Sequence, residues 1–311
     1  MALDVASKVA IITGAGSGIN FSFAKLLLEN KCNVILADLT LRPEAADLVS
    51  SYSDGSATPR AIYMRVDVTD WKQLEEMFRM AEHEFGHADI ICPGAGVFEP
   101  VSTAKNEVPF SNFWIPPATG SSADSPQMSR YASIDINLSH PIRCTQLAIS
   151  HFIRHKIPGS IVLISSMAAQ SSYIGCPLYV AAKHGISGFV RSLAGLERPP
   201  NPKVPPIRVS AVAPGIVKTP IWLESDKIQW LHSEKDKWVA PEEVADVMLG
   251  LIQKDDYKGG SVVEVGRNKV RKVEMLNDPG PQGDGLTVSA GVKGVEEVWK
   301  RLSEPSWGQY T

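Results

Sequence analysis

The chain has 311 residues, with 31 Lys plus Arg against 34 Asp plus Glu, so its formal net charge is −3. That balance, together with the lack of a long basic run, argues against a phosphate-backbone binder, and we expect no nucleic-acid partner. A hydrophobic fraction of 44% and a charged fraction of 21% are ordinary for a globular protein and argue against disorder.

The sequence lacks a secretory signal, a membrane-spanning run and a paired-cysteine motif, which favours an intracellular protein. No apolar run is long enough to span a bilayer, and the first residues lack the charged-then-apolar pattern of a secretory signal. The cysteines, at positions 32, 92, 144 and 176, are widely spaced and form no C-x-x-C pair. We therefore expect reduced thiols in a cytoplasmic protein without a membrane span.

Short apolar runs alternate with helix-length segments along most of the chain. We expect strands at residues 8–13, 33–38, 61–66, 88–92, 160–164, 207–212 and 261–265, and helices at 21–30, 71–85 and 179–196. Nearly unbroken apolar strands between helices predict an α/β fold, with a seven-stranded parallel sheet covered by helices on both faces. Because no linker interrupts this alternation, we expect one large domain over residues 1–266. Within this domain we expect an irregular insertion at residues 100–130, and after it a C-terminal extension at residues 267–311.

A glycine-rich turn follows the first strand. Residues 13–19 read T-G-A-G-S-G-I and lead into a helix, whose N-terminal N–H groups and dipole favour a pyrophosphate. Asp38 ends the second strand, 20 residues after Gly18. A carboxylate there can accept hydrogen bonds from an adenosine ribose and repels a 2′-phosphate. Leu39 and Thr40 follow without a basic residue, so NAD is favoured over NADP.

A phenol, an ammonium and a hydroxyl form the candidate catalytic group. Tyr179 and Lys183 lie four residues apart, on one face of a predicted helix. Ser166 lies 13 residues upstream of Tyr179, just past a buried strand. A nearby Lys cation and a nicotinamide cation would both favour the tyrosinate, which would then act as a general base. On its own, Y-x-x-x-K also fits an amphipathic helix with a surface lysine.

Taken in order, these motifs resemble the short-chain dehydrogenase/reductase family over residues 8–266, and the resemblance implies a single Rossmann-type domain. The markers are Thr13-Gly14-x-x-x-Gly18, Asp67-Val68, Gly94-Ala95-Gly96, Asn137, Ser166, Tyr179-x-x-x-Lys183 and Pro214-Gly215-x-x-x-Thr219. The set is far more specific than any one motif within it.

The resemblance implies a role for each matching residue. Tyr179 would exchange a proton with the substrate oxygen, and Ser166 would hydrogen-bond that oxygen. Lys183 would lower the pKa of Tyr179 and bind the nicotinamide ribose, while Asn137 would hold a water that links Lys183 to solvent. The implied cofactor-binding residues are Gly14, Ser17, Gly18, Ile19, Asp38, Asp67, Val68, Ala95, Gly96, Tyr179, Lys183, Pro214, Gly215, Val217 and Thr219.

Two positions depart from the family pattern. The third glycine of the family's turn is Asn20 here, and the asparagine of its Asn-Ala-Gly motif is Gly94. That asparagine usually braces the strand end beside the cofactor, so its loss raises a question about local rigidity. Neither change removes a catalytic atom.

Two other groups of side chains are open to more than one interpretation. Residues 219–240 contain Trp222, Trp230 and Trp238, in a region that covers the substrate in this family. They either face an apolar substrate or pack on the core or a subunit interface. His151 and His155 are four residues apart, but the glutamate of H-E-x-x-H is absent and Arg154 lies between them. We therefore assign no metal and expect these histidines to belong to a solvated helix end.

The resulting prediction is an NAD-dependent oxidoreductase that interconverts a secondary alcohol and a ketone. The pattern is most like hydroxyprostaglandin- and hydroxysteroid-type dehydrogenases, which implies a bulky apolar substrate such as a lipid, steroid, polyketide or terpenoid. Two alternatives stay open: a non-redox isomerase, dehydratase or cyclase of the same fold, and a cofactor-sensing protein. The family resemblance also implies a homodimer or homotetramer.

Overall fold

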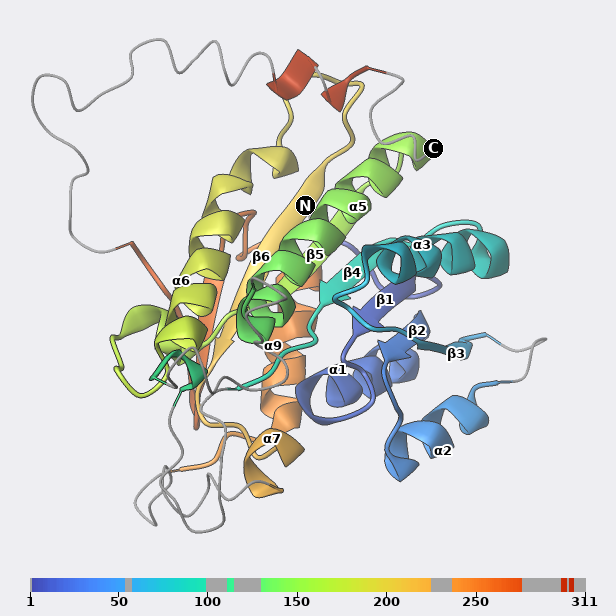
Figure 1. Cartoon of the computed structure of the whole chain (residues 1–311). Coiled ribbons are helices and arrows are strands. Elements are labelled where there is room, and N and C mark those ends of the chain that lie inside the picture. The colour runs from blue at the N-terminus through green and yellow to red at the C-terminus, as the bar shows by residue number, and fades with distance from the viewer. Residues whose placement is uncertain are drawn as a thin grey trace, which may run out of the picture.

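The computed structural model describes residues 2–53, 58–98, 111–114, 130–224, 237–275, 298–300 and 302–304. Most of the predicted insertion at residues 100–130 and of the C-terminal extension at residues 267–311 lies outside these ranges. Within these residues, eight strands form one sheet in the order β3-β2-β1-β4-β5-β6-β7-β8 (Figure 1). They are β1 (Val9–Thr13), β2 (Asn33–Asp38), β3 (Ala61–Arg65), β4 (Ile90–Pro93), β5 (Gly159–Ile164), β6 (Ile207–Pro214), β7 (Val262–Gly266) and β8 (Lys269–Lys272). The first seven are parallel, which confirms the parallel Rossmann-type sheet.

The eighth strand corrects the predicted strand number. β8 pairs antiparallel with β7 through a short turn in which Asn268 has a φ of 57°. All four residues of β8 are exposed, and three of them are basic, so the strand lacks the apolar run by which the others were found. Its position at the sheet edge fits this composition, because charged side chains there discourage pairing with another chain.

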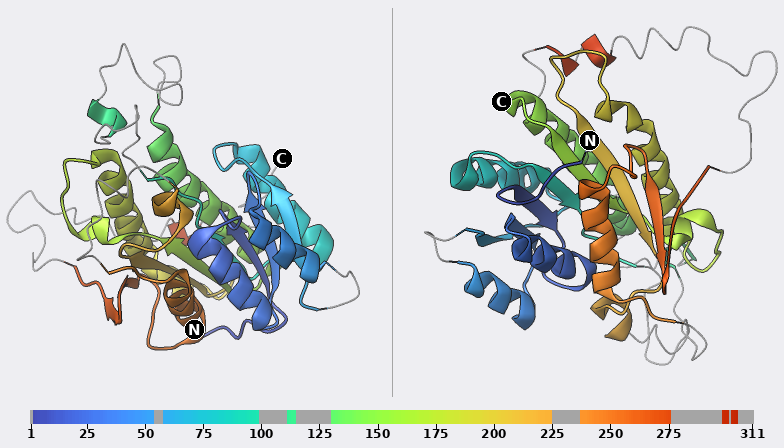
Figure 2. Two further views of the ribbon diagram at one scale, coloured as in Figure 1. Left: turned by 90° about the horizontal axis from the view of Figure 1, so that it is seen from below. Right: turned by 180° about the vertical axis from the view of Figure 1, so that it is seen from behind.

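Helices cover both faces of the sheet, as predicted (Figures 1 and 2). The core on one face includes α1 (Gly18–Glu29), α2 (Pro43–Ser51) and α9 (Pro241–Gln253), and the core on the other includes α3 (Trp71–Phe85), α5 (His140–His155) and α6 (Pro177–Ser192). Successive strand residues alternate between these two cores: Ile11 packs in one and Ile12 in the other. Shorter helical segments are η1 (Asn112–Trp114), α4 (Ala132–Ile134), η5 (Asp135–Ser139), η6 (Met167–Gln170), η7 (Ala194–Glu197) and α7 (Pro220–Leu223).

The strand order places a crevice at the carboxyl ends of the central strands. The chain runs outward from β1 through β2 to β3 and then returns to β4 on the other side of β1. At such a reversal the connecting segments leave in opposite directions, and α/β proteins bind ligands there. The segments that follow β1, β2, β4, β5 and β6 contain most of the predicted site residues.

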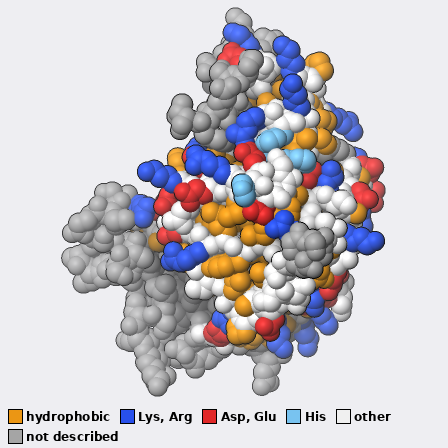
Figure 3. Space-filling model, turned by 90° about the vertical axis from the view of Figure 1, so that its right-hand side faces the viewer, with side chains coloured by type: hydrophobic (Ala, Val, Ile, Leu, Met, Phe, Trp, Pro, Cys, Tyr) orange, Lys and Arg blue, Asp and Glu red, His pale blue; other side chains and the backbone are white. Residues whose placement is uncertain are grey.

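The surface shows no sign of a large single-charge field on the face drawn in Figure 3. There, acidic and basic side chains are intermingled around a band of apolar ones. Among the described residues, no helix combines the length and apolar character needed to cross a bilayer.

A buried arginine joins β6 to the C-terminal end of α9. Arg208 Nε donates to Glu197 Oε1 at 2.8 Å, and its Nη1 donates to the carbonyl oxygens of Leu251 and Lys254 at 3.1 and 2.8 Å. The Arg208 side chain is fully buried. Burial alone would raise the pKa of Glu197, but hydrogen bonds from the Gly259 N–H and from Arg208 lower it to about 2. The arrangement satisfies helix-end carbonyls that would otherwise be buried without donors.

We therefore expect Arg208→Met to lower the free energy of unfolding by about 3 kcal/mol or more, because it breaks a buried ion pair and removes the donor to the Leu251 and Lys254 carbonyl oxygens. Arg271→Met is the matched control, since Arg271 pairs with Glu264 at an exposed position and such pairs contribute about 0–1 kcal/mol. Urea denaturation measures both variants. Equal midpoints would show that the buried pair has no special role.

Candidate active site

The predicted site residues converge on one cavity of about 370 Å³. Every catalytic and cofactor residue named from the sequence lines it, from the turn after β1 to the segment after β6. Additional lining residues that the sequence did not single out include Val97, Ile136, Pro220 and Ile221. Residues from eight separate segments of the chain thus meet in a cavity of the size expected for a ligand.

The glycine turn leaves the N-terminus of α1 open to this cavity. Gly14 and Gly18 have φ values of +72° and +61°, a backbone conformation that glycine adopts without strain. The helix begins after Ser17, but no side chain caps its first N–H groups and no acidic residue lies in its first turn. An uncapped helix N-terminus attracts anions, because its N–H groups lack partners and the helix dipole adds positive potential.

Asp38 holds the glycine turn in place. Its Oδ2 accepts a hydrogen bond from the Gly16 N–H at 2.8 Å, and its Oδ1 accepts one from the Leu39 N–H at 2.7 Å. Each oxygen keeps a second acceptor position, so the carboxylate can still receive ribose hydroxyls. Arg42 is the nearest basic residue along the chain after Asp38, and its guanidinium is bound by both carboxylate oxygens of Glu224.

Ser166, Tyr179 and Lys183 form the reactive end of the cavity. Ser166 follows β5 and caps η6 by accepting the Ala168 N–H at 3.1 Å. It also hydrogen-bonds the hydroxyl of Tyr179, which projects from α6. Lys183, one turn later on α6, donates from Nζ to the Ile164 carbonyl oxygen at 2.8 Å and lies 5.5 Å from the centre of the Tyr179 ring.

Burial controls the protonation of both groups. It raises the pKa of Tyr179 to about 12, although the Ser166 hydrogen bond acts in the opposite direction. Burial also lowers the pKa of Lys183 to about 8. Lowering of the Tyr179 pKa by Lys183 therefore stays a prediction for the site with its cofactor bound, where a further positive charge is present.

Asn137 lies in the π-helical turn η5 and braces the loop after β4. Its Oδ1 accepts the Val97 N–H at 3.0 Å, and its Nδ2 donates to the Val97 carbonyl oxygen at 2.9 Å and to Ser133 Oγ at 3.2 Å. The side-chain amide is thus engaged with protein groups. The predicted role of Asn137 in holding a water remains untested, and the structure adds a bracing role.

A second brace from the same helical segment was missed in the sequence. His140 is buried at the start of α5, with Nδ1 3.1 Å from the Ile136 carbonyl oxygen and Nε2 3.1 Å from Thr13 Oγ1. Because a carbonyl only accepts, Nδ1 carries the proton and Nε2 accepts from the Thr13 hydroxyl. Thr13 Oγ1 in turn accepts the Ala95 N–H at 3.2 Å. This series of hydrogen bonds connects α5 to the end of β1 and to the loop after β4, which lines the cavity.

Aromatic side chains form one wall beside Tyr179. The ring of Phe98 meets the Tyr179 ring edge-on at 4.9 Å and lies 5.0 Å from the ring of Trp222. Trp222 also contacts Trp238 at 6.5 Å, and it lines the cavity. Trp222 therefore lines the cavity and also packs against other aromatic rings, whereas Trp230 lies outside the described residues. Phe98 was not singled out, although it directly follows the Gly94-Ala95-Gly96 motif and Val97.

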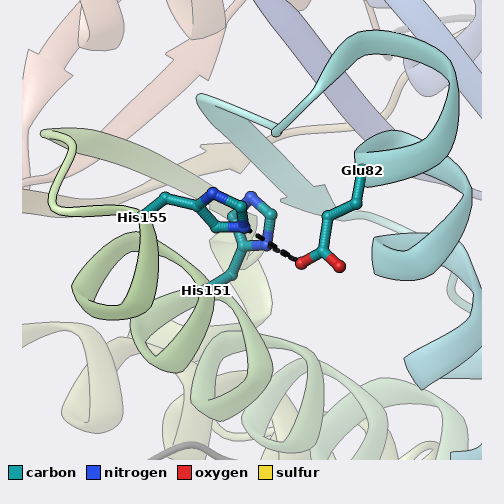
Figure 4. Close-up of side chains that lie close together, drawn as sticks. All are labelled: Glu82, His151 and His155. Carbon is teal, nitrogen blue, oxygen red and sulfur yellow. Dashed lines mark hydrogen bonds and ion pairs between the residues drawn. The ribbon is translucent and has the colours of Figure 1, made fainter. Parts of the chain in front are cut away.

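A separate polar cluster lies between α3 and α5, where Glu82, His151 and His155 point toward one another (Figure 4). Their potential ligand atoms lie within 4.8 Å of one another. His151 is fully buried and not, as expected, part of a solvated helix end. Its Nε2 accepts the Ala88 N–H at 2.9 Å, so its proton is on Nδ1, which donates to Glu82 Oε1 at 3.1 Å.

This cluster is poorly suited to a metal. A cation bound to Nδ1 of His151 would have to replace the proton that the Ala88 hydrogen bond keeps there. The guanidinium of Arg154 also binds Glu82 Oε1, so an added cation would meet a like charge. Because a carboxylate shared by several donors already accounts for the geometry, we assign the cluster to packing of α5 against α3.

The two buried histidines predict an acid-sensitive fold. Burial lowers the pKa of His140 to about 4, assisted by the charge of Lys183 and opposed by the Ile136 hydrogen bond, while an unfolded histidine has a pKa of about 6.5. Burial likewise lowers the pKa of His151, to about 3. Because the unfolded chain binds these protons first, the free energy of unfolding should fall as pH drops below about 6.5.

His140→Gln keeps a polar group but removes one titrating site. We expect its unfolding free energy to depend less steeply on pH between about 6.5 and 4, by up to about 1.4 kcal/mol per pH unit. Denaturant titrations at several pH values measure the slope, and His184→Gln, at an exposed position on α6, is the control. A slope in His140→Gln equal to that of the unmodified chain would contradict the assignment.

Comparison with known proteins identifies relatives of the chain. Residues 8–229 match the family model for short chain dehydrogenases. The chain is 29% identical to 15-hydroxyprostaglandin dehydrogenase (NAD⁺) of Rattus norvegicus, over 86% of this chain and 94% of the relative. It is 33% identical to (−)-trans-carveol dehydrogenase of Rhodococcus erythropolis, over 70% of this chain and 73% of the relative.

A solved structure shows the same fold. The crystal structure of a short-chain type dehydrogenase/reductase from Mycobacterium marinum aligns with a TM-score of 0.67 at 23% identity, covering 84% of this chain and 95% of that one. Together with the match over most of the Rossmann-type region, these relatives confirm the resemblance seen in the motifs. The chain belongs to the short-chain dehydrogenase/reductase family of oxidoreductases.

Proposed function

We propose that this chain is an NAD-dependent oxidoreductase that interconverts a secondary alcohol and a ketone, with Tyr179 as its general acid–base. The observation that carries the proposal is the buried Tyr179 hydroxyl, hydrogen-bonded by Ser166, in the same cavity as Asp38 and the open N-terminus of α1. A proton-transfer group and a nucleotide-binding turn therefore share one cavity. The relatives with dehydrogenase names support this reading.

The residues present fit a dinucleotide. The uncapped N–H groups at the start of α1 suit a pyrophosphate, and the Asp38 carboxylate suits the adenosine ribose. Val68 and Asp67 would border the adenine, while Lys183 would bind the nicotinamide ribose. Pro214, Gly215, Val217 and Thr219 would border the carboxamide. NAD, when bound, supplies the hydride acceptor for alcohol oxidation.

The chain itself handles the proton. During oxidation the Tyr179 oxygen takes the proton of the substrate hydroxyl, and during reduction it returns that proton to the ketone oxygen. The Ser166 hydroxyl donates a hydrogen bond to the Tyr179 oxygen or to the substrate oxygen, and it stabilises negative charge on whichever oxygen it binds. The ammonium of Lys183 adds positive potential beside the ring, which favours the tyrosinate that oxidation requires.

The wall beside Tyr179 favours a bulky apolar alcohol. Trp222, Ile221 and Val97 line the cavity, and the ring of Phe98 contacts both the Tyr179 ring and the Trp222 ring. An apolar substrate buried against these side chains would gain about 25 cal/mol for each Å² removed from water. We therefore propose a substrate of lipid, steroid, polyketide or terpenoid type, and the hydroxyprostaglandin and carveol dehydrogenases among the relatives support that class.

Two other functions use the same residues. A non-redox isomerase, dehydratase or cyclase would keep its cofactor unchanged after turnover, and a cofactor sensor would bind NAD without turning over. Ser166, Tyr179 and Lys183 are all present in the cavity, which is compatible with a non-redox enzyme. A cofactor sensor would not need these three residues, so their presence gives that function no support. A cytoplasmic location and a homodimeric or homotetrameric assembly stay as predictions.

Tyr179→Phe should remove the proton-transfer atom while keeping the ring that packs against Phe98. We expect alcohol-dependent NADH formation to fall at least about 100-fold, as expected for loss of a general acid–base, with NAD binding nearly unchanged. Tyr173→Phe is the matched control, because Tyr173 is exposed and lies outside the cavity. If Tyr179→Phe kept most of its activity, another group would be the proton acceptor.

Asp38→Asn should weaken the preference for NAD. The carboxamide lacks the charge that repels a 2′-phosphate, so we expect the NAD-to-NADP ratio of kcat/KM to fall by about tenfold or more, which corresponds to about 1.4 kcal/mol. Asp47→Asn, at an exposed position on α2, serves as the control. Steady-state kinetics with both cofactors measure the ratio. NADP used as well as NAD by the unmodified chain would refute the role of Asp38.

A further inference from the structure

The two departures from the family motif lie against each other. Asn20, in the first turn of α1, is buried, and its side-chain amide covers Gly94 in the loop after β4. A Cβ atom built on Gly94 would lie 2.3 Å from Asn20 Oδ1 and 2.7 Å from its Cγ and Nδ2. Any side chain at position 94 would therefore collide with the amide.

Steric exclusion, and not backbone conformation, explains the glycine. Gly94 is absent from the residues with positive φ, so its backbone is one that other residues adopt readily. The three atoms nearest to such a Cβ all belong to the Asn20 amide, so this amide is the group that a side chain at position 94 would meet first. Conversely, the amide fits there only because position 94 lacks a side chain.

The Asn20 amide also lies against Cys92, near the end of β4, and against Gly14 of the glycine turn. The Cys92 thiol of β4 lies 3.8 Å from Asn20 Oδ1, in position to donate a hydrogen bond, and burial raises the pKa of that thiol, which keeps it protonated. On the other side, Asn20 Nδ2 would lie 3.0 Å from a Cβ atom built on Gly14. The amide thus fills the space between the turn after β1 and the loop after β4, which both line the cavity.

We propose that Asn20 and Gly94 are one exchanged pair: α1 supplies the amide that the family motif carries on the loop after β4. Asn20 is then a positioning residue that holds the glycine turn against residues 94–96. The part of this inference that concerns NAD rests on the proposed function. The packing of the pair does not depend on it.

A double-mutant cycle tests the pair. Gly94→Ala places a Cβ against the amide, and we expect at least a tenfold rise in the Kd for NAD together with a lower Tm. Asn20→Ala removes the amide, so the double variant Asn20→Ala/Gly94→Ala should bind NAD at least threefold more tightly than Gly94→Ala alone. Gly188→Ala is the matched control, because a Cβ there meets no atom within 4 Å. Independent sites would instead give additive effects.

The reversed motif tests the exchange itself. Asn20→Gly/Gly94→Asn is expected to bind NAD within about threefold of the unmodified chain, whereas Gly94→Asn alone should bind at least tenfold more weakly. The pair lies against the glycine turn, where the proposed NAD pyrophosphate would bind, and not against Tyr179. KM for NAD should therefore change more than kcat. Wild-type affinity in Gly94→Ala, or additive Kd and Tm changes, would overturn the inference.

Failure of the proposed function would be recognised separately. If the unmodified chain does not bind NAD, the function is refuted, yet the Tm values still report whether positions 20 and 94 are coupled. A lower Tm with unchanged Kd values and an unchanged KM would show a purely structural contact and would overturn the positioning role.

Discussion

Burial of the Tyr179 hydroxyl is the constraint on which the proposed chemistry depends. A phenol removed from water holds its proton strongly, and the pKa of about 12 reflects this. Oxidation of an alcohol at neutral pH requires the opposite, so positive charge and hydrogen-bond donors must be placed beside the oxygen. Ser166, in the segment after β5, already supplies a hydrogen bond that lowers the pKa of Tyr179. We propose that Lys183, which lies 5.5 Å from the centre of the Tyr179 ring, and the bound cofactor supply the positive charge.

The surrounding polar groups fix the loop after β4 next to this tyrosine. Asn137 binds both backbone groups of Val97, and His140 acts through Thr13 on Ala95. Each hydrogen bond contributes about 1 kcal/mol, but a buried group left without its partner costs about 1–3 kcal/mol. The π-helical turn and the start of α5 therefore set the position of residues 95–98, and through Phe98 they set the aromatic wall beside the Tyr179 ring.

Much of this architecture could be predicted because its signals are local. Apolar runs marked seven parallel strands, since strands covered on both faces bury nearly every side chain. The motif residues were found in order and do converge on one cavity. β8 was missed because an exposed edge strand such as KVRK needs no apolar pattern.

Other features depend on contacts between distant residues. The burial of His140 and His151 follows from partners on β1 and α3, which no local pattern reveals. The spacing of Asn20 and Gly94 gave no reason to connect them, and only packing shows that one occupies the space the other leaves. Phe98 and Trp222 are 124 residues apart in the chain, so their shared wall required the fold.

The most direct test of the central claim is the stoichiometry of turnover. The unmodified chain is incubated with NAD and a panel of secondary alcohols that runs from small to bulky and apolar, and NADH is measured by absorbance alongside the ketone product. We predict one NADH for each ketone, with the highest kcat/KM for bulky apolar alcohols. Turnover of a substrate without NADH formation, or NAD binding with no turnover across the panel, would contradict the account.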